Sequence, residues 1–532
     1  MKRKTTLLSV LTIIGAMSLA GCGGGGGESV DSTKAQLTIM TYDGGVGDAW
    51  LNKAARDFEA SNKDRTDFEE GKTGVQIHVT KARIGGDSLL DTDLTYDMYF
   101  TENVNYYAMK NKNKFADITD ILNAANPKDG GKKIIDKIDD NLKDFMNING
   151  KYYAVPFYDC IYGLFYDKDL FLEESFYMTD DGDFTDDVDM FGTGPNGVSG
   201  DWDDGLPRTY EEFGKLMKEM RDHSVTPFTY STNVNMAGYT ARGLMSYWSD
   251  DEGLEQTNLN YTFNGTARNI VTDIVDGKAV TEEVAITNEN GYLLRKQAGI
   301  YNSLKFADEI LCSTPGNYRG ASDVQTAQIN FVVGKHTNQA VGMIFEGTWW
   351  QNEAVNAINI AKTQFAETSF NYGIMPIPKS DVSKVGEDAT FLNLNASYGF
   401  INPAAKNMKL TKEFFSYLHE DAQLKAFTLQ TGMTRALDYT LTELEKANVS
   451  TFTKDIISIK QSEHANLVYP YSGLDFVINN PYIFSTDSWA YSTTNLGDNP
   501  VISFINNQST AESYFNQHIS SLTPEQWANL FK

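Results

Sequence analysis

The sequence predicts an α/β fold divided into two or more lobes. Residues 36–42 alternate apolar and polar side chains and end at Asp43-Gly44-Gly45, which is typical of a strand running into a loop. Residues 50–58 then carry apolar side chains at helical spacing, residues 75–79 alternate again, and residues 96–100 predict another short strand. Strands that alternate with helices indicate an α/β sheet. With 532 residues, the chain is longer than one hydrophobic core usually serves, so we expect at least two lobes.

The first residues predict an export signal followed by a lipid anchor. A positively charged start precedes a short apolar stretch at residues 7–19, which is too short to span a membrane. Leu19-Ala20-Gly21-Cys22 resembles the bacterial lipobox, in which the cysteine becomes the lipidated first residue; the alternative is an ordinary signal peptide with a chance cysteine. We expect a signal peptide at 1–21, and at 22–35 the lipidated Cys22 with a flexible Gly-rich tether.

The composition excludes several classes of function. The formal net charge of −26 argues against a nucleic-acid partner, because phosphate binding needs clustered Lys and Arg. We expect no membrane-spanning helix, since no later stretch of about eighteen residues is uncharged and apolar. Besides Cys22, the chain has only Cys160 and Cys312, without the spacing of a zinc site. We expect two buried thiols there, with a single disulfide as the alternative.

An acidic insertion occupies residues 179–206. Its many carboxylates repel one another unless they are solvated or bridged by a cation. Calcium binds several such oxygens, although the spacing does not match the EF-hand loop. A solvated loop and a calcium loop therefore both remain open, with Asp181, Asp183 and Asp187 as the candidate calcium ligands.

Two later segments have marked boundaries. Thr209 and Glu212 predict a capping box at the start of an amphipathic helix. Residues 265–294 are typical of hairpins, with Asn290-Gly291 as a turn signal.

Several segments, taken in order, resemble the family 1 extracellular solute-binding proteins of sugar ABC transporters. Each is a weak motif alone, but their order and spacing, with the lipobox, extend over most of residues 36–441. The matching segments are Tyr152-Tyr153-Ala154-Val155-Pro156, residues 164–171, Pro207 to Phe213, Ala340-Val341-Gly342-Met343 leading to Gly347-Thr348-Trp349, Met375-Pro376-Ile377-Pro378, and residues 412–418 leading to Thr431-Gly432.

The resemblance implies a two-lobed, type II periplasmic-binding-protein-like clamp with a hinge between the lobes. One lobe would hold residues 36–155 and 390–442, and the other 156–389 and 443–532. Such a protein is not an enzyme: as a monomer, anchored outside the bacterial cell membrane, it captures a carbohydrate and delivers it to the permease subunits of an ABC importer. The acidic insertion, the hairpins and the long tail depart from the family pattern.

A sugar offers a flat, weakly apolar face and a ring of hydroxyls, which suit aromatic planes and fixed polar groups. Residues 340–345 predict a buried strand, and Trp349 leaves it at a glycine turn that matches the family's Gly-x-Trp. We therefore expect Trp349, or its neighbour Trp350, to stack on the sugar; the alternative is that either indole fills the core.

Polar candidates lie where predicted strands end. Ligands of α/β sheets bind beyond the carboxyl ends of the strands, which favours Tyr42 and Asp43 after the first strand and Glu102 and Asn103 after residues 96–100. Turn formation is the alternative for Asp43. The remaining candidates are Tyr158 and Asp159 beside the hinge, Trp248 in a loop, and Glu346 and Arg435, for which a salt bridge is the alternative.

Two other functions remain open. A peptide-binding lipoprotein of an ABC importer often has about this length, and a secreted glycoside hydrolase would also carry aromatic residues and paired carboxylates. The hydrolase is disfavoured because the sequence singles out no two carboxylates for acid and base roles. The sequence implies no cofactor apart from the possible calcium.

Overall fold

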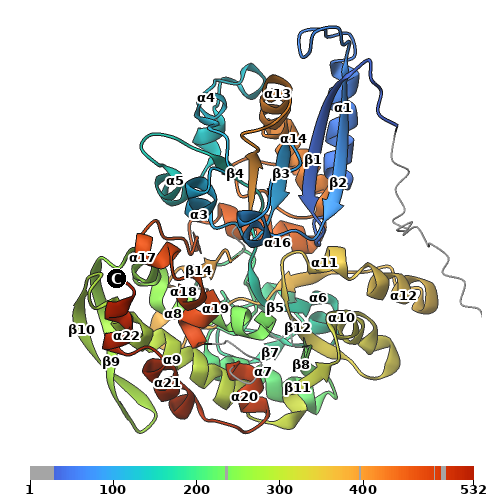
Figure 1. The fold of residues 1–532 in the computed structure, drawn as a ribbon. Helices are drawn as coiled ribbons and strands as arrows, with labels where there is room; N and C mark the ends of the chain where they lie inside the picture. The colour runs from blue at the N-terminus through green and yellow to red at the C-terminus, as the bar shows by residue number, and fades with distance from the viewer. Residues whose placement is uncertain (1–28, 234–237, 395–396, 485, 493–498) are drawn as a thin grey trace, which may run out of the picture.

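A computed structural model describes the chain from residue 29 to residue 532, except residues 234–237, 395–396, 485 and 493–498. The predicted signal peptide and the lipidation site at Cys22 lie outside the described residues. Two five-stranded sheets form the centres of two lobes, one above the other in Figure 1. The predicted α/β, two-lobed fold is confirmed.

The first lobe, uppermost in Figure 1, has the strand order β2-β1-β3-β15-β4. The early strands run parallel, and β15 lies antiparallel between β3 and β4. In β1, the alternating residues Leu37 and Ile39 are fully buried, which explains the apolar and polar alternation in the sequence. The elements are β1 (Ala35–Tyr42), α1 (Ala49–Ser61), β2 (Val75–Ala82), α2 (Gly86–Leu90), β3 (Met98–Thr101), α3 (Tyr106–Asn111), α4 (Thr119–Leu122), α5 (Asp140–Met146), β4 (Ala154–Pro156), β15 (Tyr398–Ile401), α13 (Met408–Leu418) and α14 (Asp421–Thr431).

The second lobe has the strand order β11-β8-β12-β5-β13, with β12 parallel to β8 and antiparallel to β5. Every residue of β12 is buried, as expected for a central strand covered on both faces. Its elements are β5 (Tyr162–Asp167), α6 (Lys168–Glu173), α7 (Tyr210–Asp222), β8 (Thr226–Ser231), α8 (Gly238–Thr262), α9 (Ala298–Lys305), β11 (Tyr318–Ala321), α10 (Val324–Val333), β12 (Val341–Gly347), α11 (Trp350–Glu353), α12 (Val355–Phe365) and β13 (Tyr372–Ile374).

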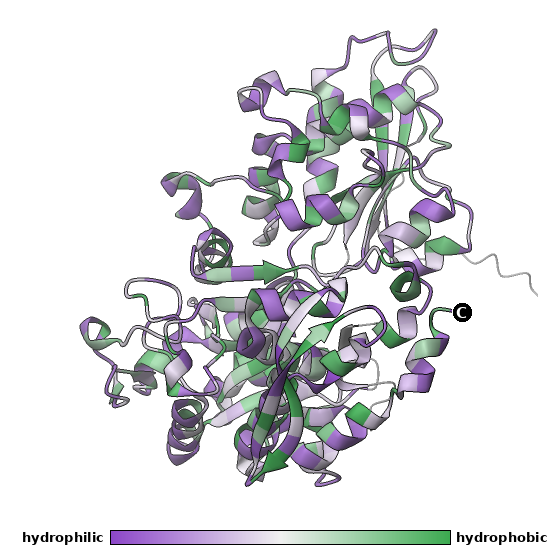
Figure 2. Cartoon of the chain, turned by 90° about the vertical axis from the view of Figure 1, so that its left-hand side faces the viewer, coloured by the Kyte–Doolittle hydropathy of each residue, from purple (hydrophilic) through white to green (hydrophobic). Residues whose placement is uncertain are grey.

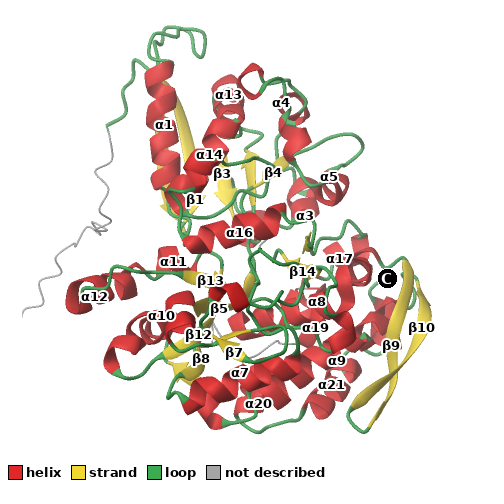
Figure 3. Ribbon diagram, turned by 180° about the vertical axis from the view of Figure 1, so that it is seen from behind, coloured by secondary structure: helices red, strands yellow, loops and turns green. Residues whose placement is uncertain are grey.

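The chain passes between the lobes more than once. It leaves the first large sheet after β4 and enters the second at β5, and it returns from β13 of the second sheet to β15 of the first. Seen from behind, α16 (Thr451–Gln461) lies at the junction of the lobes (Figure 3). Near it, β14 (Ala389–Leu392) pairs with β16 (Ala465–Val468). The exact lobe boundaries stay a prediction.

The C-terminal tail is helical, and the β9–β10 ribbon lies on the outside of the second lobe, facing the viewer in Figure 2. Within the part of the chain that the structure describes, no helix has the length and apolar character needed to cross a membrane. These elements are β9 (Gly265–Val275), β10 (Lys278–Ile286), α17 (Asp475–Ile478), α18 (Pro481–Phe484), α19 (Thr486–Tyr491), α20 (Pro500–Ile505), α21 (Ala511–Ser520) and α22 (Pro524–Asn529).

Two local predictions are confirmed only in part. The hairpin exists, but its turn is at Asp276-Gly277, where both residues have positive φ; Asn290 instead precedes a 3-10 helix. The Thr209 side chain caps α7 by accepting from the backbone N–H of Glu212, as predicted. The Glu212 carboxylate, however, accepts from the backbone N–H of Arg208 and not from that of Thr209.

The acidic insertion is an exposed loop at the three candidate calcium ligands, which do not converge. The Asp187 carboxylate accepts from the backbone N–H of Asp189, and the backbone N–H of Asp183 donates to Thr179. Among the described residues, no group of three or more His, Cys, Asp or Glu is placed to hold a metal ion. The calcium prediction for Asp181, Asp183 and Asp187 therefore finds no support.

The two cysteines of the folded part form no disulfide with each other. Cys160 is buried at the junction of the lobes, and Cys312 is half-buried in the second lobe. The prediction of two buried thiols is confirmed for Cys160, whereas Cys312 is a thiol that is only half-buried.

Candidate ligand-binding site

Five of the predicted ligand residues line one cavity of about 200 Å³ between the lobes: Tyr42, Asp43, Glu102, Asn103 and Trp349. The first four follow β1 and β3 of the first lobe, and the indole follows β12 of the second lobe. Parallel strands end at one edge of their sheet, which is why the strand-end rule brought the first four together. The other lining residues are Gly44, Gly45, Arg83, Tyr162, Tyr239, Arg242 and Glu353.

The Trp349 indole is held by close packing. Its ring lies over Gly347, where any Cβ would collide with it, so the turn after β12 requires glycine. The rings of Tyr162 and Tyr239 meet it edge to face, with centroid distances of 4.9 and 5.8 Å. The indole is therefore a fixed aromatic wall.

Two carboxyl groups of the cavity are partly withdrawn from water. Burial raises the pKa of Glu102 to about 7, although the hydrogen bond that it accepts from the Tyr158 hydroxyl opposes this effect. Burial also raises the pKa of Glu353, against a hydrogen bond from the side chain of Trp349. Glu102 can therefore exchange between donor and acceptor roles near neutral pH.

Two guanidinium groups supply the opposite charge. Arg242 Nη1 donates to the Tyr162 hydroxyl at 2.8 Å, and its guanidinium carbon lies 5.3 Å from the Tyr162 ring centroid. Arg83 Nε donates to the backbone carbonyl of Asp43 at 3.0 Å. Cations, carboxylates, an amide and aromatic rings thus surround one small volume, which suits a neutral ligand rich in hydroxyl groups.

Tyr158 and Asp159 lie next to the cavity at the hinge but do not line it. The Tyr158 hydroxyl orients Glu102. Asp159 accepts hydrogen bonds from Lys460 Nζ at 2.7 Å and from the Thr434 hydroxyl at 2.8 Å. Through these contacts, Tyr158 and Asp159 hold together the segments at the junction of the lobes.

Four further candidates lie in the core, away from the cavity lining. Trp248 and Trp350 are fully buried, and the Trp350 ring packs on other aromatic rings. Glu346 is also buried, which raises its pKa well above the ordinary value, and it accepts from Gln328 Nε2 at 3.2 Å. A ligand in the cavity would therefore not touch these side chains.

Arg435 is the fourth of these candidates, and it does not pair with Glu346. Its Nε donates to the backbone carbonyl of Phe157 and its Nη2 contacts His419. Its guanidinium carbon lies 5.3 to 5.9 Å from the ring centroids of four aromatic residues, Trp50, Phe100, Phe157 and Phe427.

Five side chains that line the interlobe cavity were not predicted from the sequence. Arg83 follows β2, so the rule that indicated Tyr42 and Glu102 would have found it too. Glu353 lies about one helical turn beyond Trp349, and Tyr162 is the first residue of β5. The other two, Tyr239 and Arg242, begin α8, where no local pattern distinguishes them.

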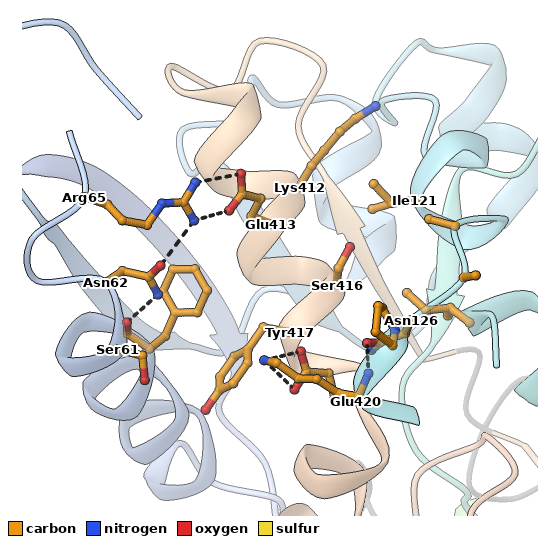
Figure 4. A pocket seen from close by; sticks show the side chains of 16 residues that line it. Ser61, Asn62, Arg65, Ile121, Asn126, Lys412, Glu413, Ser416, Tyr417 and Glu420 are labelled. Carbon is orange, nitrogen blue, oxygen red and sulfur yellow. Dashed lines mark hydrogen bonds and ion pairs between the residues drawn. The ribbon is translucent and has the colours of Figure 1, made fainter. Parts of the chain in front are cut away.

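A larger cavity of about 510 Å³ lies within the first lobe, between α1, α13 and the loop near Asn126 (Figure 4). Its charged side chains are already paired: Arg65 Nη1 lies 2.6 Å from Glu413 Oε2, and Lys128 Nζ lies 2.8 Å from Glu420 Oε1. Because all its walls belong to one lobe, lobe closure cannot act on a ligand there. The interlobe cavity is therefore the better candidate site.

Known structures share this architecture. The GacH receptor of Streptomyces glaucescens GLA.O, described unliganded and in complex with acarbose, is 12% identical, with a TM-score of 0.53 over 92% of this chain and 97% of that chain. RafE in complex with raffinose is 14% identical, with a TM-score of 0.52 over 89% and 99%. The cyclic alpha-maltosyl-1,6-maltose binding protein from Arthrobacter globiformis is 12% identical, with a TM-score of 0.50 over 93% and 99%. At such identities, these structures establish the fold.

A search of curated proteins found no match. The family described as bacterial extracellular solute-binding protein matches residues 39–297, which hold the first lobe's parallel strands and the first half of the second lobe. Over residues 39–297, this chain is therefore similar to the bacterial extracellular solute-binding proteins, and its two-lobed fold is that of the solved structures above.

Proposed function

We propose that this protein captures a sugar or an oligosaccharide by closing its two lobes and delivers it to the permease of an ABC importer. The observation that carries the proposal is the interlobe cavity, where Trp349 of the second lobe faces Glu102 and Asn103 of the first. An indole stacks on the apolar face of a sugar ring, while carboxyl and amide groups bind its hydroxyls. The solved structures above add support, since their descriptions name acarbose, raffinose and a cyclic maltosyl-maltose.

Closure follows from the two-sided construction of the cavity. A ligand that touches both walls favours the arrangement in which they are close, so binding shifts the lobes toward the closed form. The closed form is what the importer recognises in this proposal. In this proposal, one lobe holds residues 36–155 with 390–442, and the other holds 156–389 with 443–532.

The proposed location is the extracytoplasmic face of the bacterial cell membrane, with Cys22 as the lipid anchor. The Gly-rich tether at 22–35 would let the folded part reach both free ligand and permease. The protein acts as a monomer in this proposal and does not change its ligand chemically.

Titration calorimetry with a panel of saccharides and peptides tests the proposal. We expect heat of binding with at least one saccharide and none with the peptides. Binding of peptides alone would contradict it and favour a peptide receptor. Sustained release of sugar products from a glycan would instead identify a hydrolase.

A further inference from the structure

The cavity at Trp349 is the first of a row of adjoining cavities. A second cavity of about 350 Å³ shares Asn103 and Arg242 with it, and a third of about 440 Å³ shares Phe145, Tyr471 and Ser472 with the second. Shared lining residues make consecutive cavities neighbours. The row therefore follows the boundary of the lobes from the end of β1 to α5.

The middle cavity has walls from both lobes. The first lobe contributes Phe145 of α5 and Tyr398 of β15, and the loop after β16 contributes Tyr471. The Tyr471 ring centroid lies 5.4 Å from that of Phe145 and 6.2 Å from that of Tyr398. Because Phe145 and Tyr471 are only partly buried, the middle cavity has aromatic surface available to a ligand.

Polar groups accompany these rings. The Tyr398 side chain is 1% exposed, and its hydroxyl has no hydrogen-bond partner among the described residues. A buried hydroxyl without a partner costs free energy, and a ligand hydroxyl would remove that cost. Asn103, Asp87 and Ser472 also line the cavity. Rings and polar groups are thus interleaved here as they are around Trp349.

The Trp349 cavity and the middle cavity together have room for a ligand longer than one ring. Cavities that bind small molecules usually measure about 300–1,000 Å³, and the Trp349 cavity alone is smaller than this range. Together with the middle cavity it falls within the range. A ligand that fills both must be longer than one ring.

We propose that the ligand is an oligosaccharide that extends from the Trp349 cavity into the middle cavity, where Tyr471 stacks on a second part of its chain and Tyr398 binds a hydroxyl. This inference rests on the proposed function and adds the ligand's length and a second subsite. The loop that carries Tyr471 belongs to the long tail in which this chain departs from the family pattern.

The test is titration calorimetry of the purified protein with α- and β-linked gluco-, galacto- and fructo-oligosaccharides, from single rings to hexamers. We expect affinity to rise about tenfold or more from the shortest member that binds to the longer ones, since an aromatic contact contributes on the order of a factor of ten. Equal affinity at every length, or preference for a single ring, would overturn the inference and leave the proposed function intact. No saccharide binding at all would contradict the proposed function itself.

Variants locate the second subsite. Tyr471→Ala should abolish the gain with length and leave the affinity for the shortest ligand within about twofold, because that ligand occupies the Trp349 cavity. Tyr471→Phe keeps the ring and should keep most of the gain. Tyr417→Ala, in the first-lobe cavity of Figure 4, is the matched control and should change neither affinity. If Tyr471→Ala weakens short and long ligands equally while melting like the parent protein, the second subsite is wrong.

Discussion

Gly45 lies directly against Trp349 across the cleft: a Cβ at Gly45 would be 2.7 Å from the Cβ of the tryptophan. The glycine belongs to the loop after β1 of the first lobe, and the indole to the turn after β12 of the second. A tryptophan Cβ is fixed to its backbone and cannot swing aside. The close approach of the lobes therefore depends on the missing side chain at Gly45.

Gly45→Ala should weaken ligand binding by about tenfold, because the added methyl group keeps the lobes from closing fully. Calorimetry measures the loss, and small-angle X-ray scattering should show a larger radius of gyration in the presence of ligand. Gly214→Ala on α7 is the control, because its Cβ would meet only ordinary contacts, the nearest at 3.6 Å. Unchanged affinity and radius in Gly45→Ala would show that the contact does not limit closure.

Trp349→Ala should weaken binding by about thirtyfold or more, as expected when a central aromatic contact is removed. The change in tryptophan fluorescence on ligand binding should also become smaller. A variant that is folded but merely less stable would not show this smaller change. Phe365→Ala is the control: this partly exposed ring of α12 stacks on His336 with a centroid distance of 4.9 Å, and it does not line the cavity. Full affinity in Trp349→Ala would remove the indole from the proposed site.

Adjacent tryptophans show where the sequence alone is insufficient. Gly347 gives the Trp349 ring room to fold back beside the cavity, whereas Trp350 starts α11 and packs 4.8 Å from the Tyr372 ring in the core. The Gly-x-Trp pattern favoured the first indole, and that indole lines the cavity. Only the packing of distant segments separates it from the second.

Sequence periodicity could predict only those features that depend on residues close together in the chain. The ends of β1 and β3, and with them Tyr42 and Glu102, follow from local alternation and from the geometry of parallel strands. In contrast, Arg242 lies on a helix that is buried along most of its length, so no amphipathic pattern indicates which of its side chains meets the cavity. Tyr471 reaches the first lobe through contacts between segments more than 300 residues apart, such as its approach to Phe145.

Glu102 should make stability depend on pH. Its pKa is raised from the ordinary 4.5 to about 7 by burial, so below 4.5 the group is protonated in both states and causes no penalty. As the pH rises from 4.5 to 7, the unfolded chain releases its proton first, and the free energy of unfolding falls. Above this window the penalty is constant.

Glu102→Gln stays neutral at every pH and removes this dependence. Relative to the parent protein, its free energy of unfolding should rise by on the order of 2 kcal/mol between about pH 5 and about pH 8, as measured by urea unfolding. Glu443→Gln, at a side chain that is 90% exposed, is the control and should show no such change. A constant difference across the pH range for Glu102→Gln would mean that the pKa is not raised.

The proposed anchor at Cys22 can be tested in cells. Cys22→Ser should move the protein from the membrane fraction to the soluble extracytoplasmic fraction, because the proposed lipid is attached through the cysteine thiol and a serine hydroxyl is not lipidated by this pathway. Immunoblots of the two fractions measure the shift, and Cys312→Ser is the control. Membrane association that persists in Cys22→Ser would contradict the lipoprotein prediction.

The junction of the lobes should depend on a buried ion pair. Asp159, 3% exposed, accepts from Lys460 Nζ at 2.7 Å. Lys460→Met keeps the length of the side chain but leaves the carboxylate without its cation, which should cost about 3–5 kcal/mol of unfolding free energy. Lys454→Met, at an exposed position of the same helix, is the control and should cost less than about 0.5 kcal/mol.

Adding Asp159→Asn to Lys460→Met should recover most of that loss, because the neutral amide can still accept from the Thr434 hydroxyl, which lies 2.8 Å from the Asp159 carboxylate. Urea unfolding of the single and double variants measures the coupling between the two side chains. If the two losses simply add, the pair contributes through packing alone. A recovered double variant would instead show that the buried charge, once unpaired, is what weakens the junction.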